Sequence, residues 1–336
     1  MADLKLSLAC WDYDRTRALR DGSVKPAGID LTYLETFPAE TFQRMLKFRE
    51  FDVSELGFKF YVSSLGLEDP PFIAIPVFPL RLFRHSAIFI NREAGINEPR
   101  DLIGKRIGEP FAYGHDAAIW ARGVLSDEYG VPVESASYLV GAVDAHFKRD
   151  FAPFPPTPNI RVEQLRTDQT LDAMLESGEL DALYSAIAPP SYLNASPRVG
   201  RLFENYPDVE RGYFAETGIF PIMHTVVIRK ELYRANPWIA QSLYTAFKEA
   251  KRAAYEHYRY WGSFQHATYA IPWLSAHMED NRRLMGDDWW PYGLADNRKT
   301  IEAFLRYHHE QGLSKRQLKA EDLFAPETLV DYAASA

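Results

Sequence analysis

Apolar and polar residues alternate between strand-like and helix-like periods along the N-terminal part of the chain. Leu4–Cys10 is a short apolar run typical of a buried strand, and residues 28–35 carry apolar side chains at every second position. Pro38–Phe48 repeats its apolar residues with the period of a helix that buries one face, and residues 51–56 return to the strand pattern. Strands that are separated by helices favour a parallel sheet.

The same alternation returns in the middle of the chain. Residues 106–108 predict a strand, Asp116–Tyr129 a helix, residues 159–165 a strand, residues 168–177 a helix and residues 180–185 a strand. This repeat of order, without a repeat of sequence, predicts a second lobe of the same α/β class.

Two apolar segments connect the two sets of elements. Residues 86–91 and His224–Arg229 flank the second set, and each has the length of a single strand. We therefore predict a discontinuous first lobe of residues 1–91 plus 225–336 and a second lobe of residues 92–224. A ligand cleft is expected between the two lobes.

Beyond residue 229 the pattern is nearly all helical. Asn236 and Pro237 predict a helix start, with asparagine as the cap and proline in the first turn, and another amphipathic helix follows residue 300. This helical C-terminal segment is expected to pack on the first lobe. Residues 150–159 contain four prolines, which predicts a surface loop of the second lobe.

Length, charge and cysteine content exclude several classes of protein. At 336 residues, the chain is long enough for two domains that each bury a core. Its formal net charge of −8 argues against nucleic acid or an anionic membrane as a partner, because both require a basic face. The single cysteine, Cys10, excludes an internal disulfide and a cysteine-rich zinc site. The sequence has no signal-peptide pattern and no apolar run near the roughly 20 residues that span a bilayer, so we expect a cytoplasmic protein.

Candidate functional residues lie where the predicted strands end, because ligands in open α/β sheets bind beyond the carboxyl ends of the strands. Residues 11–15, 55–59, 113–116 and 184–190 meet this condition, and residues 81–85 lie beside the first connector. Two of these segments begin helices, whose N-termini attract anions. The side chains expected to contact a substrate are Trp11, Asp14, Arg15, Glu55, Lys59, Arg81, Arg84, Tyr113 and Tyr184.

Two arginines and a histidine, Arg81, Arg84 and His85, fall within five residues beside the first connector. A guanidinium matches the planar geometry of a carboxylate, so an anion-binding role is favoured over solvated charge or pairing with Glu55. Glu55 itself follows a buried strand, where a carboxylate needs either a partner or a catalytic task.

Acid–base chemistry has three histidine candidates. His115 is followed by Asp116 at a predicted helix start, although an aspartate there is also an ordinary residue of a first helical turn. His224 begins an apolar strand and His85 lies beside the arginines, and each has a purely structural alternative. The sequence has no glycine-rich phosphate loop, nucleophile elbow or zinc-protease histidine spacing.

Several distinctive segments are spread over nearly the whole chain: Trp-Asp-Tyr-Asp-Arg-Thr at 11–16, Phe-Asp-Val-Ser-Glu at 51–55, Phe-Arg-His-Ser at 83–86, Thr-Gly-Ile-Phe-Pro-Ile-Met-His-Thr at 217–225, Met-Gly-Asp-Asp at 285–288, Trp-Pro-Tyr-Gly at 290–293 and Leu-Phe-Ala-Pro-Glu-Thr at 323–328. Together these segments resemble the 4,5-dihydroxyphthalate decarboxylase family, and the similarity spans nearly the whole chain. The resemblance implies a two-lobed fold like that of type II periplasmic binding proteins. It also implies non-oxidative removal of one carboxylate from a hydroxylated benzene dicarboxylate, which gives protocatechuate and carbon dioxide. The chain departs from the family pattern at residues 58–59, 114–116 and 187, all on predicted cleft loops.

A ring hydroxyl para to the carboxylate gives such a decarboxylation a route that avoids an aryl carbanion. Once deprotonated, the hydroxyl pushes electron density to the carbon that bears the carboxylate; an acid protonates this carbon, and carbon dioxide leaves. We expect His115, oriented by Asp116, to be the main acid–base group and His85 or His224 to be the second. The arginines are expected to hold the carboxylates.

This scheme needs no cofactor, and a divalent ion held by His115, Asp116 and Glu55 is an alternative that the spacing does not require. Two other functions stay open: a non-catalytic binder of a small aromatic carboxylate and a decarboxylase of a different hydroxybenzoate. The state of association is open as well, since the aromatic cluster at 289–292 suits a homo-oligomer interface, a lid or a core.

Overall fold

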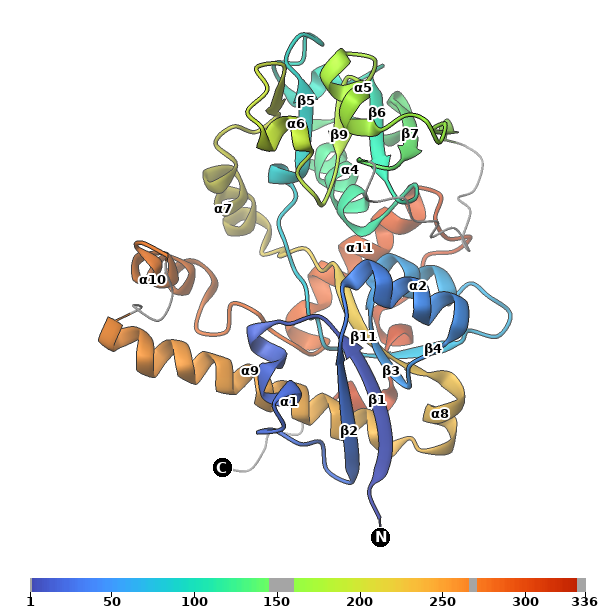
Figure 1. The fold of residues 1–336 in the computed structure, drawn as a ribbon, viewed down its shortest axis with the longest axis vertical. Coiled ribbons are helices and arrows are strands. Elements are labelled where there is room, and N and C mark those ends of the chain that lie inside the picture. The colour runs from blue at the N-terminus through green and yellow to red at the C-terminus, as the bar shows by residue number, and fades with distance from the viewer. Residues whose placement is uncertain (1, 145–159, 266–270, 331–336) are drawn as a thin grey trace.

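The protein consists of two lobes, each built around one sheet (Figure 1). The computed structural model describes residues 2–144, 160–265 and 271–330. Within these residues, the first sheet has five strands in the order β2–β1–β3–β11–β4. The strands are β1 (Leu4–Cys10), β2 (Ile29–Glu35), β3 (Val53–Gly57), β4 (Phe72–Ile75) and β11 (His224–Arg229).

Helices cross over between the first three strands, and β1 accordingly pairs in parallel with both β2 and β3. The crossovers contain η1 (Asp14–Thr16) and α1 (Arg17–Arg20), and then α2 (Pro38–Phe48). A further helix, α3 (Phe58–Ser64), follows β3 without an intervening loop. Strand β11 enters from the second lobe and runs antiparallel to β3 and β4, and α8 (Lys230–Ala235) follows it.

The second sheet has six strands among the described residues, in the order β10–β5–β9–β6–β7–β8. Strands β6 to β9 pair in parallel, whereas β5 and β10 are antiparallel additions. The strands are β5 (Ile88–Asn91), β6 (Arg106–Pro110), β7 (Ser137–Gly141), β8 (Val162–Gln164), β9 (Ala182–Tyr184) and β10 (Val199–Arg201). The helices of this lobe are α4 (Asp116–Tyr129), α5 (Leu171–Ser177), α6 (Pro190–Leu193) and α7 (Tyr206–Thr217).

The predicted alternation of strands and helices is confirmed in both lobes. Four elements have the predicted bounds: Leu4–Cys10, Pro38–Phe48, Asp116–Tyr129 and His224–Arg229. The strand predicted at residues 159–165 is shorter, because only Val162–Gln164 pairs with β7. The loop predicted at residues 150–159 lies outside the described residues.

The two connectors between the lobes lie side by side. Arg81 forms an antiparallel bridge with Ile222, and the backbone N–H of Met223 donates to the carbonyl of Leu80 at 2.9 Å. Strand β5 pairs within the second sheet, although the predicted boundary at residue 91 assigned it to the first lobe. The lobe boundaries themselves stay a prediction.

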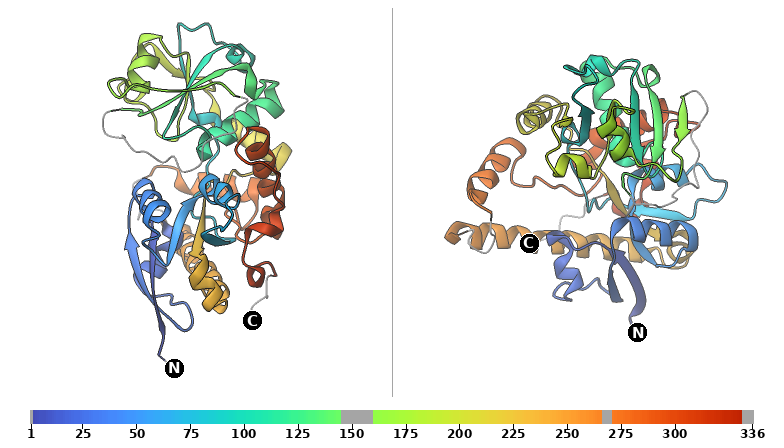
Figure 2. Two further views of the ribbon diagram at one scale, coloured as in Figure 1. Left: turned by 90° about the vertical axis from the view of Figure 1, so that its right-hand side faces the viewer. Right: turned by 45° about the horizontal axis from the view of Figure 1, so that its top comes forward.

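The helical C-terminal segment packs on both lobes and not on the first lobe alone (Figures 1 and 2). Helix α9 (Trp238–Gln265) lies against η1 and α1, whereas α11 (Arg298–Glu310) lies against α4 of the second lobe. The ring of Phe304 on α11 is centred 4.7 Å from Phe58 and 5.8 Å from Trp120. This aromatic contact joins α3 of the first lobe to α4 of the second.

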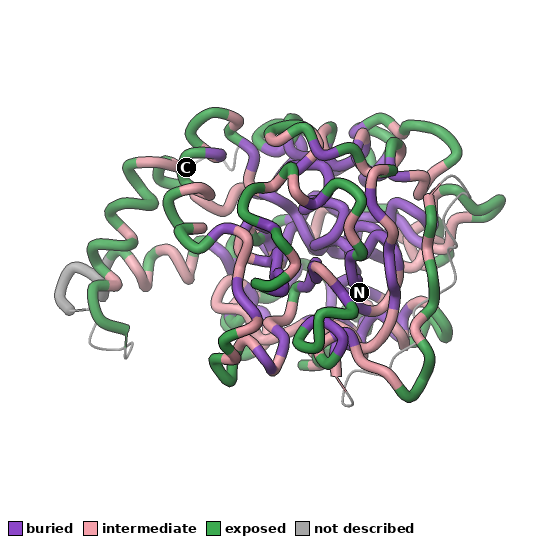
Figure 3. The backbone as a smooth tube through the Cα atoms, turned by 90° about the horizontal axis from the view of Figure 1, so that it is seen from above, coloured by how far each residue is buried: buried purple, intermediate pink, exposed green. Residues whose placement is uncertain are grey.

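Buried segments gather in the middle of the molecule, and the far end of α9 and its neighbour α10 (Leu274–Met285) project from it (Figure 3). No residue of α10 is buried. Helix α4, in contrast, is buried on several sides, because Ile119, Trp120 and Val124 belong to the core cluster of the first lobe. The two lobes therefore share a core through α4.

Candidate active site

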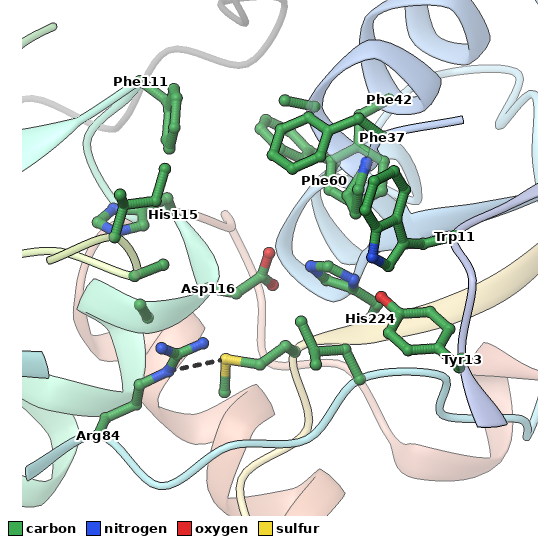
Figure 4. A pocket seen from close by; sticks show the side chains of 17 residues that line it. Trp11, Tyr13, Phe37, Phe42, Phe60, Arg84, Phe111, His115, Asp116 and His224 are labelled. Atoms are coloured by element: carbon green, nitrogen blue, oxygen red, sulfur yellow. Dashed lines mark hydrogen bonds between the residues drawn. The ribbon is translucent and has the colours of Figure 1, made fainter. Parts of the chain in front are cut away.

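A cavity of about 300 Å³ lies between the lobes, and both lobes contribute to its walls (Figure 4). Its polar side chains are few, and most of the lining is aromatic or aliphatic. The polar or ionisable residues are Arg84, His115, Asp116 and His224, together with the phenol of Tyr13. The other aromatic walls are Trp11, Phe37, Phe42, Phe60 and Phe111.

The carboxylate of Glu55 organises one side of the cavity from behind its wall. Glu55 is fully buried in the middle of β3, and it accepts hydrogen bonds from the Tyr13 hydroxyl at 2.7 Å and the Trp11 backbone N–H at 3.0 Å. Nδ1 of His224 lies 2.5 Å from the same carboxylate. Burial alone would raise the pKa of Glu55, but the hydrogen bonds from His224, Tyr13 and Trp11 lower it below its ordinary value.

An ionised Glu55 accepts hydrogen bonds only, so Nδ1 of His224 carries the proton that it donates. In a neutral imidazole, Nε2 is then the hydrogen-bond acceptor. The ring of His224 is held in place by an edge contact with Phe42, whose centroid is 4.9 Å away. With Nδ1 bound to Glu55, His224 can face a ligand only through Nε2.

Asp116, the first residue of α4, lies between His224 and Arg84 (Figure 4). One carboxyl oxygen accepts the backbone N–H of Lys59 at 2.6 Å. Burial raises the pKa of Asp116 to about 6; His224 when protonated, the backbone N–H of Lys59, and the charges of Lys59 and Arg84 oppose this rise. A carboxyl group with such a pKa holds its proton at mildly acidic pH and can act as a general acid.

The carboxyl group of Asp116 fits because residue 57 is a glycine. An added Cβ at Gly57 would lie 2.7 Å from Oδ2 of Asp116 and 3.0 Å from the ring of Phe60. The end of β3 thus comes close to the start of α4 without a side chain between them.

Arg84 supplies positive charge to the cavity. Its Nε donates to the sulfur of Met223 at 3.0 Å, and no carboxylate of the described residues forms an ion pair with it. Burial lowers the pKa of Arg84 to about 10, so the side chain stays charged at neutral pH. A buried guanidinium without a carboxylate partner favours an anionic ligand.

His115 lines the cavity but is not oriented by Asp116, as the sequence had suggested. Neither ring nitrogen of His115 has a hydrogen-bond partner among the described residues, and its Nδ1 is 3.9 Å from Glu109. The carboxyl group of Asp116 faces His224 instead (Figure 4). Burial, with the charges of Arg84 and Lys59, lowers the pKa of His115 to about 3, so this ring is neutral.

Some predicted residues lie behind the cavity wall. Glu55 acts through His224, and Lys59 is buried beside Asp116 with its ammonium 4.7 Å from the ring of Phe60. Arg15 donates to the carbonyl of Pro79 and lies over the ring of Tyr13. The carboxylate of Asp14 accepts hydrogen bonds from the Arg15 guanidinium and the Tyr258 hydroxyl. Asp14 and Arg15 therefore support the wall from outside the cavity.

Four other predicted residues lie elsewhere. His85 packs against Phe203, Tyr129 and Tyr213 in the second lobe, where burial lowers its pKa to about 4. Arg81 donates to two backbone carbonyls and lines a separate cavity of about 370 Å³. Tyr113 and Tyr184 are buried in the core of the second lobe. None of these four side chains lines the cavity, although each is close in sequence to a residue that does.

Most of the aromatic residues that line the cavity were not predicted from the sequence. Phe37 is the N-cap of α2, Phe42 lies on α2 and Phe60 lies on α3. An apolar ring in a helix is first interpreted as part of the core. Phe111 has a φ of 70°, which is rare for a bulky residue and is a signal of a functional loop that only the backbone reveals. The high aromatic content, 14% of the chain, was the available signal in the sequence.

The described part of the chain has neither a cluster of metal-ligating side chains nor a membrane-spanning helix. Residues 2–144, 160–265 and 271–330 contain no group of three or more His, Cys, Asp and Glu side chains placed to hold a metal ion. The set His115, Asp116 and Glu55 is therefore not such a group. Over the same ranges, no helix has both the length and the apolar character needed to cross a bilayer.

Comparison with known proteins identifies one relative over nearly the full length of the chain and a second over part of it. A 4,5-dihydroxyphthalate decarboxylase of Comamonas testosteroni is 34% identical over 333 residues, which cover 99% of each chain. A 4,5-dihydroxyphthalate decarboxylase of Pseudomonas putida is 34% identical over 205 residues, 61% of this chain and 79% of the relative. No protein-family model matches the chain.

Solved structures share the fold at low sequence identity. The periplasmic aliphatic sulphonate binding protein of Escherichia coli aligns with a TM-score of 0.52 and 11% identity, over 96% of this chain and 92% of the other. A periplasmic sulfonate-binding protein of Methylobacillus flagellatus aligns with a TM-score of 0.50 and 14% identity, over 98% and 94%. These likenesses confirm a fold like that of periplasmic binding proteins.

Proposed function

Because the chain belongs to the 4,5-dihydroxyphthalate decarboxylase family, we propose that its interlobe cavity removes one carboxylate from 4,5-dihydroxyphthalate and releases protocatechuate and carbon dioxide. The protein is a carboxy-lyase. In this substrate, each of the two adjacent carboxylates is para to one of the two hydroxyl groups. The observation that carries the proposal is a carboxyl group with a pKa of about 6, Asp116, facing the buried pair of His224 and Glu55 in an aromatic cavity.

We assign the base to His224 and the acid to Asp116. Nε2 of His224 takes the proton of the para hydroxyl, and the resulting phenolate pushes electron density onto the ring carbon that bears the departing carboxylate. Asp116 donates its proton to that carbon. The bond to the carboxylate then breaks, its electron pair returns to the ring, and carbon dioxide leaves. His224 returns its proton to the phenolate, and Asp116 is protonated again from water.

The remaining walls position the substrate. Arg84 binds a carboxylate through charge-assisted hydrogen bonds, and the rings of Trp11 and Phe42 limit the orientations of the benzene ring. His115, which is neutral, is assigned to contact with the substrate and not to proton transfer. The scheme uses an acid and a base of the chain itself and no cofactor.

Incubation of the purified protein with 4,5-dihydroxyphthalate tests the proposal. We expect one carbon dioxide and one protocatechuate per substrate molecule. Asp116→Asn and His224→Gln should each lower kcat about 10²–10⁴-fold, the usual contribution of general acid–base catalysis. His277→Gln changes an exposed histidine on α10 and serves as the matched control, with activity retained.

Binding without release of carbon dioxide would favour the alternative of a non-catalytic binder. Full turnover by both Asp116→Asn and His224→Gln would remove these two residues from the acid–base roles.

A further inference from the structure

The cavity offers one cation to a substrate that has two carboxylates. Among the residues that the structure describes, Arg84 is the only lysine or arginine whose side chain lines the cavity. His115 adds no positive charge, because its pKa is about 3. The ammonium of Lys59 lies over the ring of Phe60, 4.7 Å from its centroid, and Lys59 is not part of the lining. A guanidinium binds one carboxylate in a planar, bidentate way, so the second carboxylate needs another place.

Apolar residues occupy the part of the second lobe next to Arg84. Strand β5 pairs antiparallel with β9, and the N–H of Ser185 donates to the carbonyl of Ala87 at 3.0 Å. Because antiparallel partners run in opposite directions, the continuation of this pairing brings Ala186 and Ile187 to the same end of the sheet as Arg84. Both of these apolar residues line the cavity.

Phe111 completes this apolar region. It follows β6, which pairs in parallel with β9, so the residues after the two strands share one edge of the sheet. Phe111 has a left-handed backbone conformation, with a φ of 70°, and its ring forms part of the cavity wall. We refer to Phe111, Ala186 and Ile187 as the apolar wall.

The N-terminus of α4 is the other group that attracts negative charge here. Its effect is weaker than that of a guanidinium, and Asp116, the first residue of the helix, already presents a carboxyl group at this end. A second substrate carboxylate therefore gains little from the helix. It meets apolar side chains and the neutral ring of His115, whose centroid is 6.3 Å from that of Phe111. Without a cation there, a charged carboxylate is poorly stabilised and neutral carbon dioxide is not penalised.

We propose that the cavity distinguishes the two carboxylates of its substrate: Arg84 holds the one that is retained, and the apolar wall receives the one that leaves as carbon dioxide. This inference rests on the proposed decarboxylation. The bond that breaks joins the ring to the carboxylate at the wall; its electron pair returns to the ring, and the proton that replaces the carboxylate comes from Asp116. The ion pair with Arg84 thus binds the carboxylate that does not react.

A benzoate with a single carboxylate places that group on Arg84 and leaves the apolar wall empty. Such a compound binds but does not lose carbon dioxide. The reaction therefore stops after one carboxylate, and the product acts as a competitive inhibitor.

The wild-type protein tests this with 4,5-dihydroxyphthalate, 3,4-dihydroxybenzoate and 4-hydroxybenzoate, each assayed for carbon dioxide release and for competition. We expect the two monocarboxylates to inhibit competitively and to release carbon dioxide at least about 100-fold more slowly than the dicarboxylate. Comparable turnover of a monocarboxylate overturns the inference and leaves the proposed decarboxylation standing. Absence of carbon dioxide from all three compounds overturns both.

Ile187→Lys tests the wall directly, because it places a second cation beside the departing carboxylate. A lysine that pairs with this carboxylate stabilises the bound substrate more than the transition state, so KM should fall and kcat should fall about tenfold. Ile187→Met is the matched uncharged comparison: the change in KM and kcat of Ile187→Lys beyond that of Ile187→Met measures the effect of the charge. An increase in kcat of Ile187→Lys would overturn the inference.

Ala186→Ser is a second test of the wall, for the case that Ile187→Lys does not fold. It adds one hydrogen-bond donor to the wall at almost constant volume, and KM and kcat should shift in the same directions by a smaller factor. Unchanged kinetic constants in every folded variant of the wall would also overturn the inference.

Discussion

At the scale of single residues, Glu55 shows how a buried carboxylate can set the state of its neighbours. Its hydrogen bonds from Trp11, Tyr13 and His224 hold it ionised, and the ionised group in turn fixes which nitrogen of His224 carries the proton. The sequence indicated that Glu55 needed a partner, since it is a carboxylate in an apolar, strand-like segment. It did not indicate which one, because His224 is 169 positions away and only the pairing of β3 with β11 brings the two together.

Glu55→Gln should lower kcat about 10²–10⁴-fold, comparable with loss of the base itself. A neutral amide keeps the shape but no longer stabilises the protonated form of His224. Steady-state kinetics with 4,5-dihydroxyphthalate measures the effect, and a melting curve checks that the fold is kept. Wild-type kcat in a folded Glu55→Gln protein would contradict the assigned role.

The pKa of Asp116 predicts the pH dependence of the reaction. The acid must carry its proton, so kcat/KM should fall as the pH rises through about 6, by about tenfold per unit above that value. The direction follows from burial, which favours the protonated carboxyl group. A pH–rate profile with a flat response between pH 6 and 8 would be incompatible with Asp116 as the acid.

At the scale of elements, the site depends on one junction that has no connecting loop. Strand β3 runs directly into α3, and the start of α4 lies against this junction through the bond between Asp116 and the Lys59 N–H. The sequence predicted β3 and α4 but not α3. All residues of Phe58–Ser64 are buried, so the helix has no polar face and no periodic pattern to reveal it.

Gly57→Ala is expected to displace the carboxyl group of Asp116, because the new methyl group would lie 2.7 Å from its Oδ2. A shift of about 1 Å in a catalytic group costs on the order of 10²-fold in rate. The matched control is Gly95→Ala, where nothing lies within 4 Å of an added Cβ, although the positive φ of 69° makes that change mildly destabilising. Equal kcat values for the two variants would show that the close approach at Gly57 does not position the acid.

At the scale of the whole molecule, two α/β lobes with crossing connectors were predictable from periodicity and from the resemblance. The contribution of the C-terminal helices was not, because α11 reaches across to α4 through contacts such as Phe304 with Trp120, which no local pattern encodes. The same limit explains why His85, Arg81 and Tyr184 were assigned to the cleft. Proximity to a strand end predicts which edge a residue occupies but not which way its side chain points.

Buried neutral histidines predict how the stability of the protein depends on pH. The pKa values of His85, His115 and His308 are about 4, 3 and 3, lowered first of all by burial, against about 6.5 in an unfolded chain. Below pH 6.5 the unfolded state therefore binds protons that the folded state does not, so stability falls as the pH falls. Asp116 partly offsets this loss of stability, by about the contribution of one histidine. Its pKa of about 6 in the folded state lies above its value in the unfolded state.

The net loss should be roughly 2–3 kcal/mol per pH unit near pH 5, since each group contributes about 1.4 kcal/mol per unit. Urea denaturation at pH 7 and pH 5 measures this loss. His308→Gln should reduce the loss of unfolding free energy per pH unit by about the contribution of one histidine. Equal free energies of unfolding at both pH values would show that these rings are not buried in the neutral form.

A crystal structure of the protein with 3,4-dihydroxybenzoate bound tests the central claim most directly, namely that Asp116, His224 and Arg84 act on one aromatic acid in the interlobe cavity. We predict the carboxylate on Arg84, a hydroxyl group at Nε2 of His224, and the vacated ring carbon about 3–3.5 Å from the carboxyl group of Asp116. A ligand bound outside this cavity, or one whose ring carbon lies beyond the reach of Asp116, would contradict the account.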